Sequence, residues 1–140
     1  LIDDEYDVHS VNVSVLPRRE DMKVLVTGGV GFVGSHVVER LIDDEYDVTV
    51  FDLFNSETSS TKEKGTTKGY LEKRFKERSS KKGKLQFIKG NLCEYDSIYG
   101  AVEDNAITDV IHVAGLVDDR RSVNFPMEYI DVNIKGVVNL

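Results

Sequence analysis

Short apolar runs alternate with amphipathic stretches from residue 22 onward. Residues 23–27 (KVLVT) form the first apolar run, which predicts a buried β-strand. In the next stretch, FVGSHVVERLIDD, the apolar residues Val33, Val37 and Leu41 recur at helical spacing. This stretch therefore predicts an amphipathic helix over residues 32–44.

The same alternation continues to the end of the chain. Asp96 is a candidate N-cap for a helix, and Pro126 suits the first turn of another. The predicted further strands are residues 47–52 (DVTVFD), 84–90 (KLQFIKG) and 109–115 (DVIHVAG). The apolar positions of the two helices are Ile98, Ala101 and Val102, then Ile130, Ile134, Val137 and Val138. Strands that alternate with helices favour an α/β fold with a parallel sheet and right-handed crossovers.

One segment, residues 56–84, interrupts this pattern. It carries ten Lys and Arg against four Glu, a net charge of +6, which leaves −13 for the rest of a chain whose total is −7. Residues 69–79 predict a short helix with Leu71 and Phe75 as its apolar pair, and the remainder predicts a loop. The segment could guide an anionic ligand. We favour a solvated insert, because charge runs usually lie on the surface.

The two ends of the chain are unusual. The octapeptide LIDDEYDV occupies residues 1–8 and recurs at residues 41–48, but the sequences that flank the two copies differ. We therefore interpret residues 1–21 as a poorly ordered leader and residues 22–140 as the globular unit. The alternative is an ordered strand at residues 11–15 (VNVSV). Because the last residues stop within a helical pattern, we expect a piece of a longer protein.

Composition restricts the class of protein. A length of 140 residues is one domain at most, and the net negative charge argues against nucleic-acid binding. The single cysteine, Cys93, excludes an internal disulfide and is typical of a reducing compartment. No apolar run is long enough for a membrane span or a signal peptide. We expect a cytoplasmic protein.

The glycines between the first strand and the first helix indicate a dinucleotide-binding turn. Gly28 would let the chain turn off the strand. Gly31 would remove a Cβ where the backbone approaches a pyrophosphate, and Gly34 would let the helix pack closely. Phe32 and Val33 would then offer backbone N–H groups at the positive end of the helix dipole.

Asp52 strengthens this interpretation. It ends the second predicted strand, 18 residues after Gly34, where a carboxylate accepts hydrogen bonds from an adenosine ribose. The same carboxylate would repel a 2′-phosphate, so NAD is preferred over NADP. The alternative is an ordinary glycine-rich turn followed by a strand-terminal Asp.

The motif TGGVGFVGSH resembles the TGxxGxxG fingerprint of the extended short-chain dehydrogenases/reductases, which include NAD-dependent epimerases and dehydratases of sugar nucleotides. Across residues 22–140, FDLFNS, KGNLCEYDSI, IHVAGL and RSVNFPMEYIDVNIKGVVNL resemble further segments of that family. The last two are particularly similar to UDP-glucose and UDP-glucuronate 4-epimerases.

The resemblance implies a partial Rossmann fold, a doubly wound parallel sheet with strand order 3-2-1-4 that stops before a fifth strand. It implies NAD as the cofactor and a UDP-hexose or UDP-hexuronate as the substrate, with no nucleic-acid or membrane partner. The reaction would oxidise the sugar at C4, rotate the keto intermediate and return the hydride to the opposite face. Whether the whole protein is a homodimer stays open.

The resemblance also assigns cofactor contacts beyond the glycine turn and Asp52. Asn133 would brace the site from the last helix. Asn55 and Ser56 would lie near the adenosine, and Asn91 and Leu92 would lie beside the adenine. The nicotinamide side would be lined by Val113, Ala114, Gly115 and Leu116.

Two departures from the family pattern matter. Asn91 stands where the family has Asp, which should weaken the contact to adenine. The catalytic Tyr with Lys four residues later is absent; Tyr70 has Arg74 at that spacing but lies in the basic segment. We therefore assign no catalytic residue, and expect that pair beyond Leu140, no turnover and weak cofactor affinity. The alternatives are a dehydratase or reductase of the same family, or a non-catalytic NAD-binding or scaffold protein.

Other chemical candidates are weaker. His36 and His112 have no companions at metal-ligand spacing, so we predict no metal and interpret both as structural. Cys93 has no basic partner in sequence, so we interpret it as a packing residue rather than as a nucleophile. Arg120 or Arg121, in the predicted loop after the fourth strand, could contact a UDP-sugar or could simply be solvated.

Overall fold

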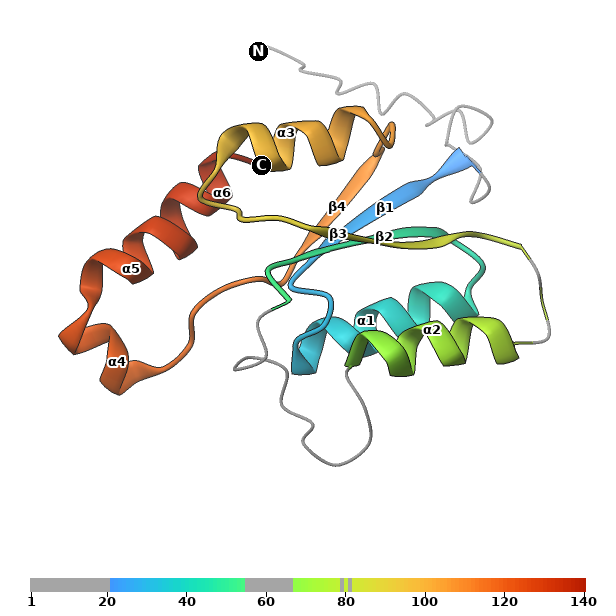
Figure 1. The fold of residues 1–140 in the computed structure, drawn as a ribbon, viewed down its shortest axis with the longest axis horizontal. Coiled ribbons are helices and arrows are strands. Elements are labelled where there is room, and N and C mark those ends of the chain that lie inside the picture. The colour runs from blue at the N-terminus through green and yellow to red at the C-terminus, as the bar shows by residue number, and fades with distance from the viewer. Residues whose placement is uncertain (1–20, 55–66, 79, 81) are drawn as a thin grey trace, which may run out of the picture.

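One parallel four-stranded sheet organises the part of the chain that the computed structural model describes, residues 21–54, 67–78, 80 and 82–140 (Figure 1). Its order is β3-β2-β1-β4, which confirms the predicted Rossmann-like α/β fold. The strands are β1 (Lys23–Thr27), β2 (Asp47–Asp52), β3 (Leu85–Lys89) and β4 (Asp109–His112). The predicted leader, with the possible strand at residues 11–15, lies outside the described residues.

Helices cover both faces of this sheet. In Figure 1, α1 and α2 lie below the strands, α3 lies above them, and the last helices extend to the left of the strand ends. The helices are α1 (Phe32–Asp43), α2 (Thr67–Glu77), α3 (Tyr95–Glu103), α4 (Asp119–Asn124), α5 (Pro126–Ile130), the π-helical turn η3 (Asp131–Lys135) and α6 (Gly136–Val138).

Alternation along the strands divides the core into two layers. Even-numbered residues of β1 and β2 face α1 and α2, where they pack with Val38, Ile42 and Leu71. Leu25 and Phe51 face the other side and pack with Ile98 of α3. Because both faces of the sheet are covered, the two central strands read as apolar runs rather than as an alternation of apolar and polar residues.

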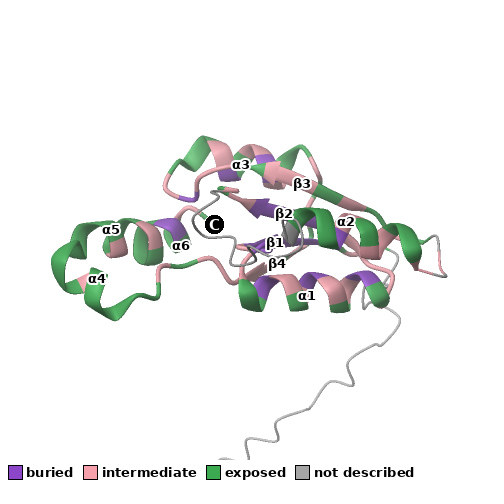
Figure 2. Cartoon of the chain, turned by 60° about the horizontal axis from the view of Figure 1, so that its bottom comes forward, coloured by how far each residue is buried: buried purple, intermediate pink, exposed green. Residues whose placement is uncertain are grey.

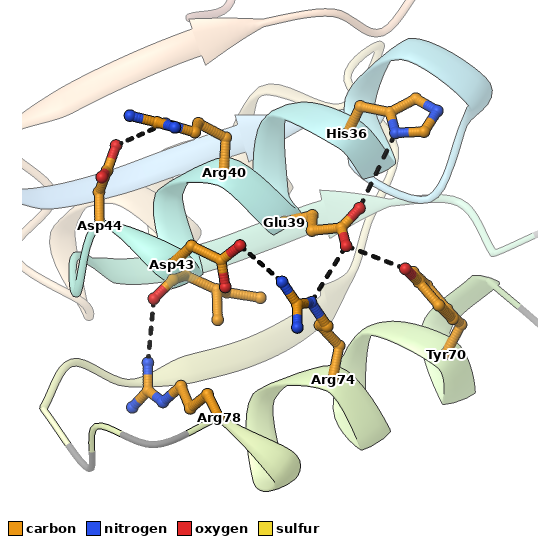
Figure 3. Close-up of polar contacts among 9 residues, drawn as sticks. His36, Glu39, Arg40, Asp43, Asp44, Tyr70, Arg74 and Arg78 are labelled. Carbon is orange, nitrogen blue, oxygen red and sulfur yellow. Dashed lines mark hydrogen bonds and ion pairs between the residues drawn. The ribbon is translucent and has the colours of Figure 1, made fainter.

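The helix predicted in the basic segment is confirmed, and it belongs to the folded layer rather than to a wholly solvated insert. Leu71 of α2 is completely buried. Arg74 donates to Glu39 at 3.1 Å and to Asp43 at 2.7 Å, and Tyr70 donates to the same Glu39 carboxylate at 2.9 Å (Figure 3). The hydrogen bond from Tyr70 to the Glu39 carboxylate raises the pKa of the phenol. These contacts fix α2 against α1, while residues 56–66, 79 and 81 of the basic segment lie outside the described residues.

The ends of two strands differ slightly from the prediction. β3 is one residue shorter at each end than residues 84–90. β4 ends at His112 rather than at Gly115, because its partner β1 ends at Thr27. At Gly28 the chain turns away with φ +69°, so β4 has no strand to pair with beyond that point.

Two helix starts also differ. Asp96 is not an N-cap: it lies inside the first turn of α3, whose N-cap is Glu94, because a turn closed by the Glu94 N–H on the Asn91 carbonyl at 3.0 Å starts the helix earlier. The predicted loop after the fourth strand contains the short helix α4. Asp118 caps this helix by accepting the Arg121 N–H at 3.0 Å.

Pro126 lies in the first turn of α5, as predicted. The apolar stripe that follows it stays uncovered in the described part of the chain: Ile130, Ile134, Val137 and Val138 are all exposed (Figure 2). None of the helices in the described ranges combines the length and apolar character that crossing a membrane requires.

Candidate functional site

The glycine turn connects β1 to α1 in a tightly bonded bend. The Gly28 N–H donates to the Phe51 carbonyl of β2 at 2.9 Å, and the Gly31 N–H donates back to the Gly28 carbonyl at 3.0 Å. Gly31 is the N-cap of α1, with extended backbone angles of φ −71° and ψ 174°. The bend therefore places the first turn of α1 directly after the carboxyl end of the central strand.

The glycines have different steric reasons for lacking a side chain. A Cβ at Gly34 would lie 2.1 Å from the Gly28 carbonyl oxygen, so α1 can pack on the turn only with glycine there. A Cβ at Gly28 would lie 2.7 Å from the backbone of Ala114. A Cβ at Gly31 would meet only the Gly28 carbonyl oxygen, at 3.2 Å, and otherwise open space. The absence of a side chain at Gly31 thus leaves open space beside the turn, into which a ligand could approach the backbone.

The start of α1 has the character of an anion site. Its N-cap makes no side-chain hydrogen bond, and no acidic residue lies in the first turn. Phe32 and Val33, which begin the helix, are both exposed. Their backbone N–H groups have no acceptor within the helix, and the helix dipole adds positive potential at this end. The helix is 12 residues long, and its open N-terminus lies beside the space that Gly31 leaves.

Asp52 stands at the end of β2 with its carboxylate turned to the glycine turn. One oxygen accepts the Val30 N–H at 3.2 Å, and the other accepts the Phe54 N–H at 3.2 Å. Each oxygen keeps acceptor capacity beyond these bonds, since an ionised carboxylate offers about four lone-pair sites. The side chain is half-buried, so the carboxylate is both held in place and accessible.

The segment after β4 lies across the point where the strand order reverses, the position at which open α/β sheets have their ligand crevice. Asn133 of η3 holds this segment with its side-chain amide: the Leu116 N–H donates to Oδ1 at 2.8 Å, and Nδ2 donates to the Leu116 carbonyl at 2.9 Å. Gly115 lies under this amide, and a Cβ there would approach Oδ1 to 3.2 Å. The Asn133 side chain thus holds the backbone of Leu116 through two hydrogen bonds.

Thr27 links the two sides, and sequence reasoning missed it. This residue is completely buried at the end of β1, and its hydroxyl lies 2.7 Å from Nδ1 of His112 on β4. The Val113 and Ala114 N–H groups donate to the same hydroxyl over longer distances, 3.3 and 3.4 Å. Burial lowers the pKa of His112 below its ordinary value. A Thr that ends one strand beside a His that ends its neighbour was the available signal.

The residues predicted near the adenine, Asn91 and Leu92, have side chains that contact other parts of the protein. Leu92 is buried in the core against α3. Asn91 uses its side chain locally: Oδ1 accepts the Cys93 N–H at 3.0 Å and Nδ2 donates to Glu94 at 3.2 Å. Asn55 and Ser56 lie outside the described residues.

The family model for GDP-mannose 4,6 dehydratase matches residues 25–140. The chain belongs to this family. It is one of the families of NAD-dependent epimerases and dehydratases, as the resemblance of the glycine motif predicted.

Relatives within these enzymes share the fold and much of the sequence. The bifunctional UDP-glucose 4-epimerase and UDP-xylose 4-epimerase 1 of Pisum sativum is 32% identical over 120 residues, 84% of this chain and 31% of that protein. The UDP-glucose 4-epimerase of Thermus thermophilus in complex with NAD is 30% identical, with a TM-score of 0.63 over 85% of this chain and 32% of that one. The Bifidobacterium longum enzyme in complex with NAD+ and UDP is 27% identical, with a TM-score of 0.67 over the same shares. The chain thus spans about a third of the length of these relatives.

Two arginines near the crevice, which the sequence could not tell apart, differ in their partners. Arg121 donates to Glu128 at 2.9 Å and stacks over Phe125, so it holds α4 against α5. The structure gives the Arg120 side chain no such ion pair among the described residues. No group of three or more His, Cys, Asp or Glu in the described ranges could hold a metal ion.

Proposed function

We propose that this chain is the NAD-binding part of a sugar-nucleotide 4-epimerase acting on a UDP-hexose or UDP-hexuronate. The observation that carries the proposal is the position of the Asp52 carboxylate against a glycine turn whose helix N-terminus is uncapped. The relatives support the cofactor, because several were crystallised with NAD. Their activities as UDP-glucose 4-epimerases support the substrate class.

The residues present fit a dinucleotide. A pyrophosphate would lie in the space that Gly31 leaves, where the N–H groups of Phe32 and Val33 would donate to its oxygens. The free acceptor sites of Asp52 would take hydrogen bonds from the adenosine ribose. The resemblance alone assigns Asn55, Ser56, Asn91 and Leu92 to the adenosine side, and the Leu92 side chain is buried against α3. Val113, Ala114, Gly115 and Leu116 would contact the nicotinamide side, held by Asn133.

Asp52 would also select the cofactor. A 2′-phosphate at the ribose would bring negative charge onto a carboxylate already fixed by two backbone N–H groups, so NAD would bind more tightly than NADP.

NAD held here would supply the hydride acceptor for oxidation at sugar C4 and the hydride donor for the reduction that follows. The chain's own contribution would be to hold the dinucleotide and fix the crevice walls. No Tyr in the 140 residues has Lys four positions later, so proton removal from the sugar hydroxyl has no assigned residue. We therefore expect the isolated chain to bind NAD without interconverting sugars.

A dehydratase is the second candidate, and the description of the matching family model favours it. Both reactions begin with oxidation at C4, but a dehydratase then eliminates water from the sugar. The two candidates differ in the nucleotide sugar that the site accepts, UDP-linked for the epimerase and GDP-linked for the family named by the model.

The test is a titration of the chain with NAD and with NADP by calorimetry, using Asp52→Asn and Gly31→Ala as variants. We expect NAD to bind more tightly than NADP, Asp52→Asn to narrow that difference, and Gly31→Ala to lose NAD. Equal affinity for the two dinucleotides, or undiminished binding by Gly31→Ala, would contradict the proposal.

Saturation-transfer NMR with UDP-glucose and with GDP-mannose, each in the presence of NAD, then separates the two enzyme classes. Contact with the UDP-sugar alone supports the epimerase, and contact with GDP-mannose alone supports the dehydratase. Contact with neither sugar would count against a sugar-binding role for this part of the protein.

A further inference from the structure

The hydroxyl of Thr27, at the end of β1, contacts three groups at the end of β4 and just after it. Nδ1 of His112 lies 2.7 Å away, and the N–H groups of Val113 and Ala114 lie 3.3 and 3.4 Å away. The Val113 N–H also reaches the Thr27 backbone carbonyl at 3.2 Å. Because Thr27 is completely buried, water does not compete for these contacts.

Counting protons fixes the direction of the short contact. A hydroxyl has one hydrogen to donate and two lone pairs to accept with. Two backbone N–H groups approach its lone pairs, that of Val113 shared with the Thr27 carbonyl, so the arrangement that satisfies every group has the hydroxyl donating its hydrogen to His112. Nδ1 is therefore the acceptor, and the neutral imidazole carries its proton on Nε2.

This arrangement sets the distance between the two walls of the crevice. Gly28 follows Thr27 directly, and its absent Cβ would lie 2.7 Å from the backbone of Ala114. The glycine turn and the segment after β4 are therefore in contact at the residues that the Thr27 hydroxyl joins. A hydroxyl that lost its acceptor on His112 would be free to rotate, and the two long N–H contacts would loosen with it.

We propose that His112 is a positioning residue for the bound dinucleotide: its Nδ1 orients the Thr27 hydroxyl, which holds the backbone of Val113 and Ala114 against the glycine turn. This inference rests on the proposed function, since it gives the crevice a dinucleotide to position.

Protonation of His112 disrupts the arrangement. An Nδ1–H would meet a hydroxyl whose lone pairs are already used, so one backbone contact would be lost. Burial is the cause of the lowered pKa, and no charged group contributes to it. The adjacent segments, residues 24–27 and 113–116, contain only apolar residues, a Gly and Thr27. The neutral form is thus the one that the fold favours.

The test compares NAD affinity of the full chain between pH 7.5 and pH 5.0 in four proteins: wild type, His112→Ala, His112→Asn and His36→Asn. Asn places an acceptor oxygen near the position of Nδ1 and does not titrate, so it retains the contact to Thr27. His36→Asn is the matched control, because His36 is exposed on α1. Ring ¹⁵N–¹H spectra of the wild type report which nitrogen carries the proton.

We expect His112→Ala to weaken NAD about fivefold at pH 7.5, the worth of one net hydrogen bond, and His112→Asn to stay within about twofold of wild type. Wild type and His36→Asn lose affinity as the pH falls, whereas His112→Asn does not. A purely structural role would lower the thermal midpoint of His112→Ala and leave the pH profile of binding unmoved.

Unchanged NAD binding by folded His112→Ala, or the same pH profile in wild type and His112→Asn, would overturn the inference. The second comparison decides the matter if His112→Ala does not fold. A proton found on Nδ1 of neutral wild-type His112 also overturns it. If wild type binds no NAD at any pH, the proposed function is wrong. That result is distinguishable from failure of the inference about His112, in which wild type does bind NAD.

Discussion

Replacing Gly34 by Ala tests the close packing of α1 on the glycine turn. The new methyl group would lie 2.1 Å from the Gly28 carbonyl oxygen, 2.8 Å from its carbon and 2.9 Å from the Gly29 Cα. All three atoms are backbone, so no flexible side chain can move aside, and the start of α1 must shift.

The magnitude follows from two opposing effects. Ala gains about 1 kcal/mol over Gly in a helix interior. Overpacking costs about 1–3 kcal/mol and more where the neighbours cannot yield. At a separation of 2.1 Å the steric cost exceeds the helix gain. We expect a net loss of about 2 kcal/mol and a thermal midpoint lower by roughly 5–10 °C.

Gly31→Ala is the matched control three residues earlier. Its methyl group meets a single atom, the Gly28 carbonyl oxygen at 3.2 Å, and the backbone at Gly31 is extended, so Ala needs only a small shift of the turn. We expect a stability change within about 1 kcal/mol, from the weaker capping of Ala alone, together with loss of NAD binding. Urea unfolding followed by circular dichroism measures both variants. Gly34→Ala as stable as wild type would refute the steric argument.

Three further predictions follow from contacts described above. Leu71→Ala should lose about 3 kcal/mol in urea unfolding, because Leu71 is completely buried between α2 and the sheet; a loss as small as that of a surface residue would contradict the docking of α2. Asn133→Ala should raise the amide exchange rate of Leu116, which loses its acceptor at 2.8 Å, whereas the control Asn124→Ala should not. Burial depresses the folded-state pKa of His112, so its contribution to stability is present above the unfolded value of about 6.5 and is lost as the pH falls through the folded pKa. Unfolding midpoints at pH 7.5 and pH 5.0 should therefore differ more in wild type than in His112→Asn, and equal differences would disprove this linkage.

Local pattern was sufficient to predict the strands, whereas their order came from the family resemblance. Val24, Val26, Val48 and Val50 mark buried strands by composition, and the glycines mark the one bend that joins β1 to α1. The position of Asp52 at a strand end was also readable, because strand boundaries follow directly from the apolar run.

Features that depend on contacts between distant segments were not readable. The single helix predicted after Pro126 contains the π-helical turn η3, which carries Asn133 into its bond with Leu116. The buried pair of Thr27 and His112 joins residues 85 positions apart. Asp96 has the composition of an N-cap, but the turn at Asn91 starts the helix before it. The first two features depend on tertiary contacts, whereas the start of α3 depends on a second local signal that competes with the first.

The pairing of β1 with β4 has a consequence for how the crevice comes into existence. The pairing brings Thr27 together with His112 over a sequence separation of 85, so its loop closure is more demanding than that of neighbouring strands joined through one helix. Both walls become adjacent only once this contact forms. A small molecule that contacts both walls would therefore bind only the fully folded state. By mass action, it would lower the population of partly folded states.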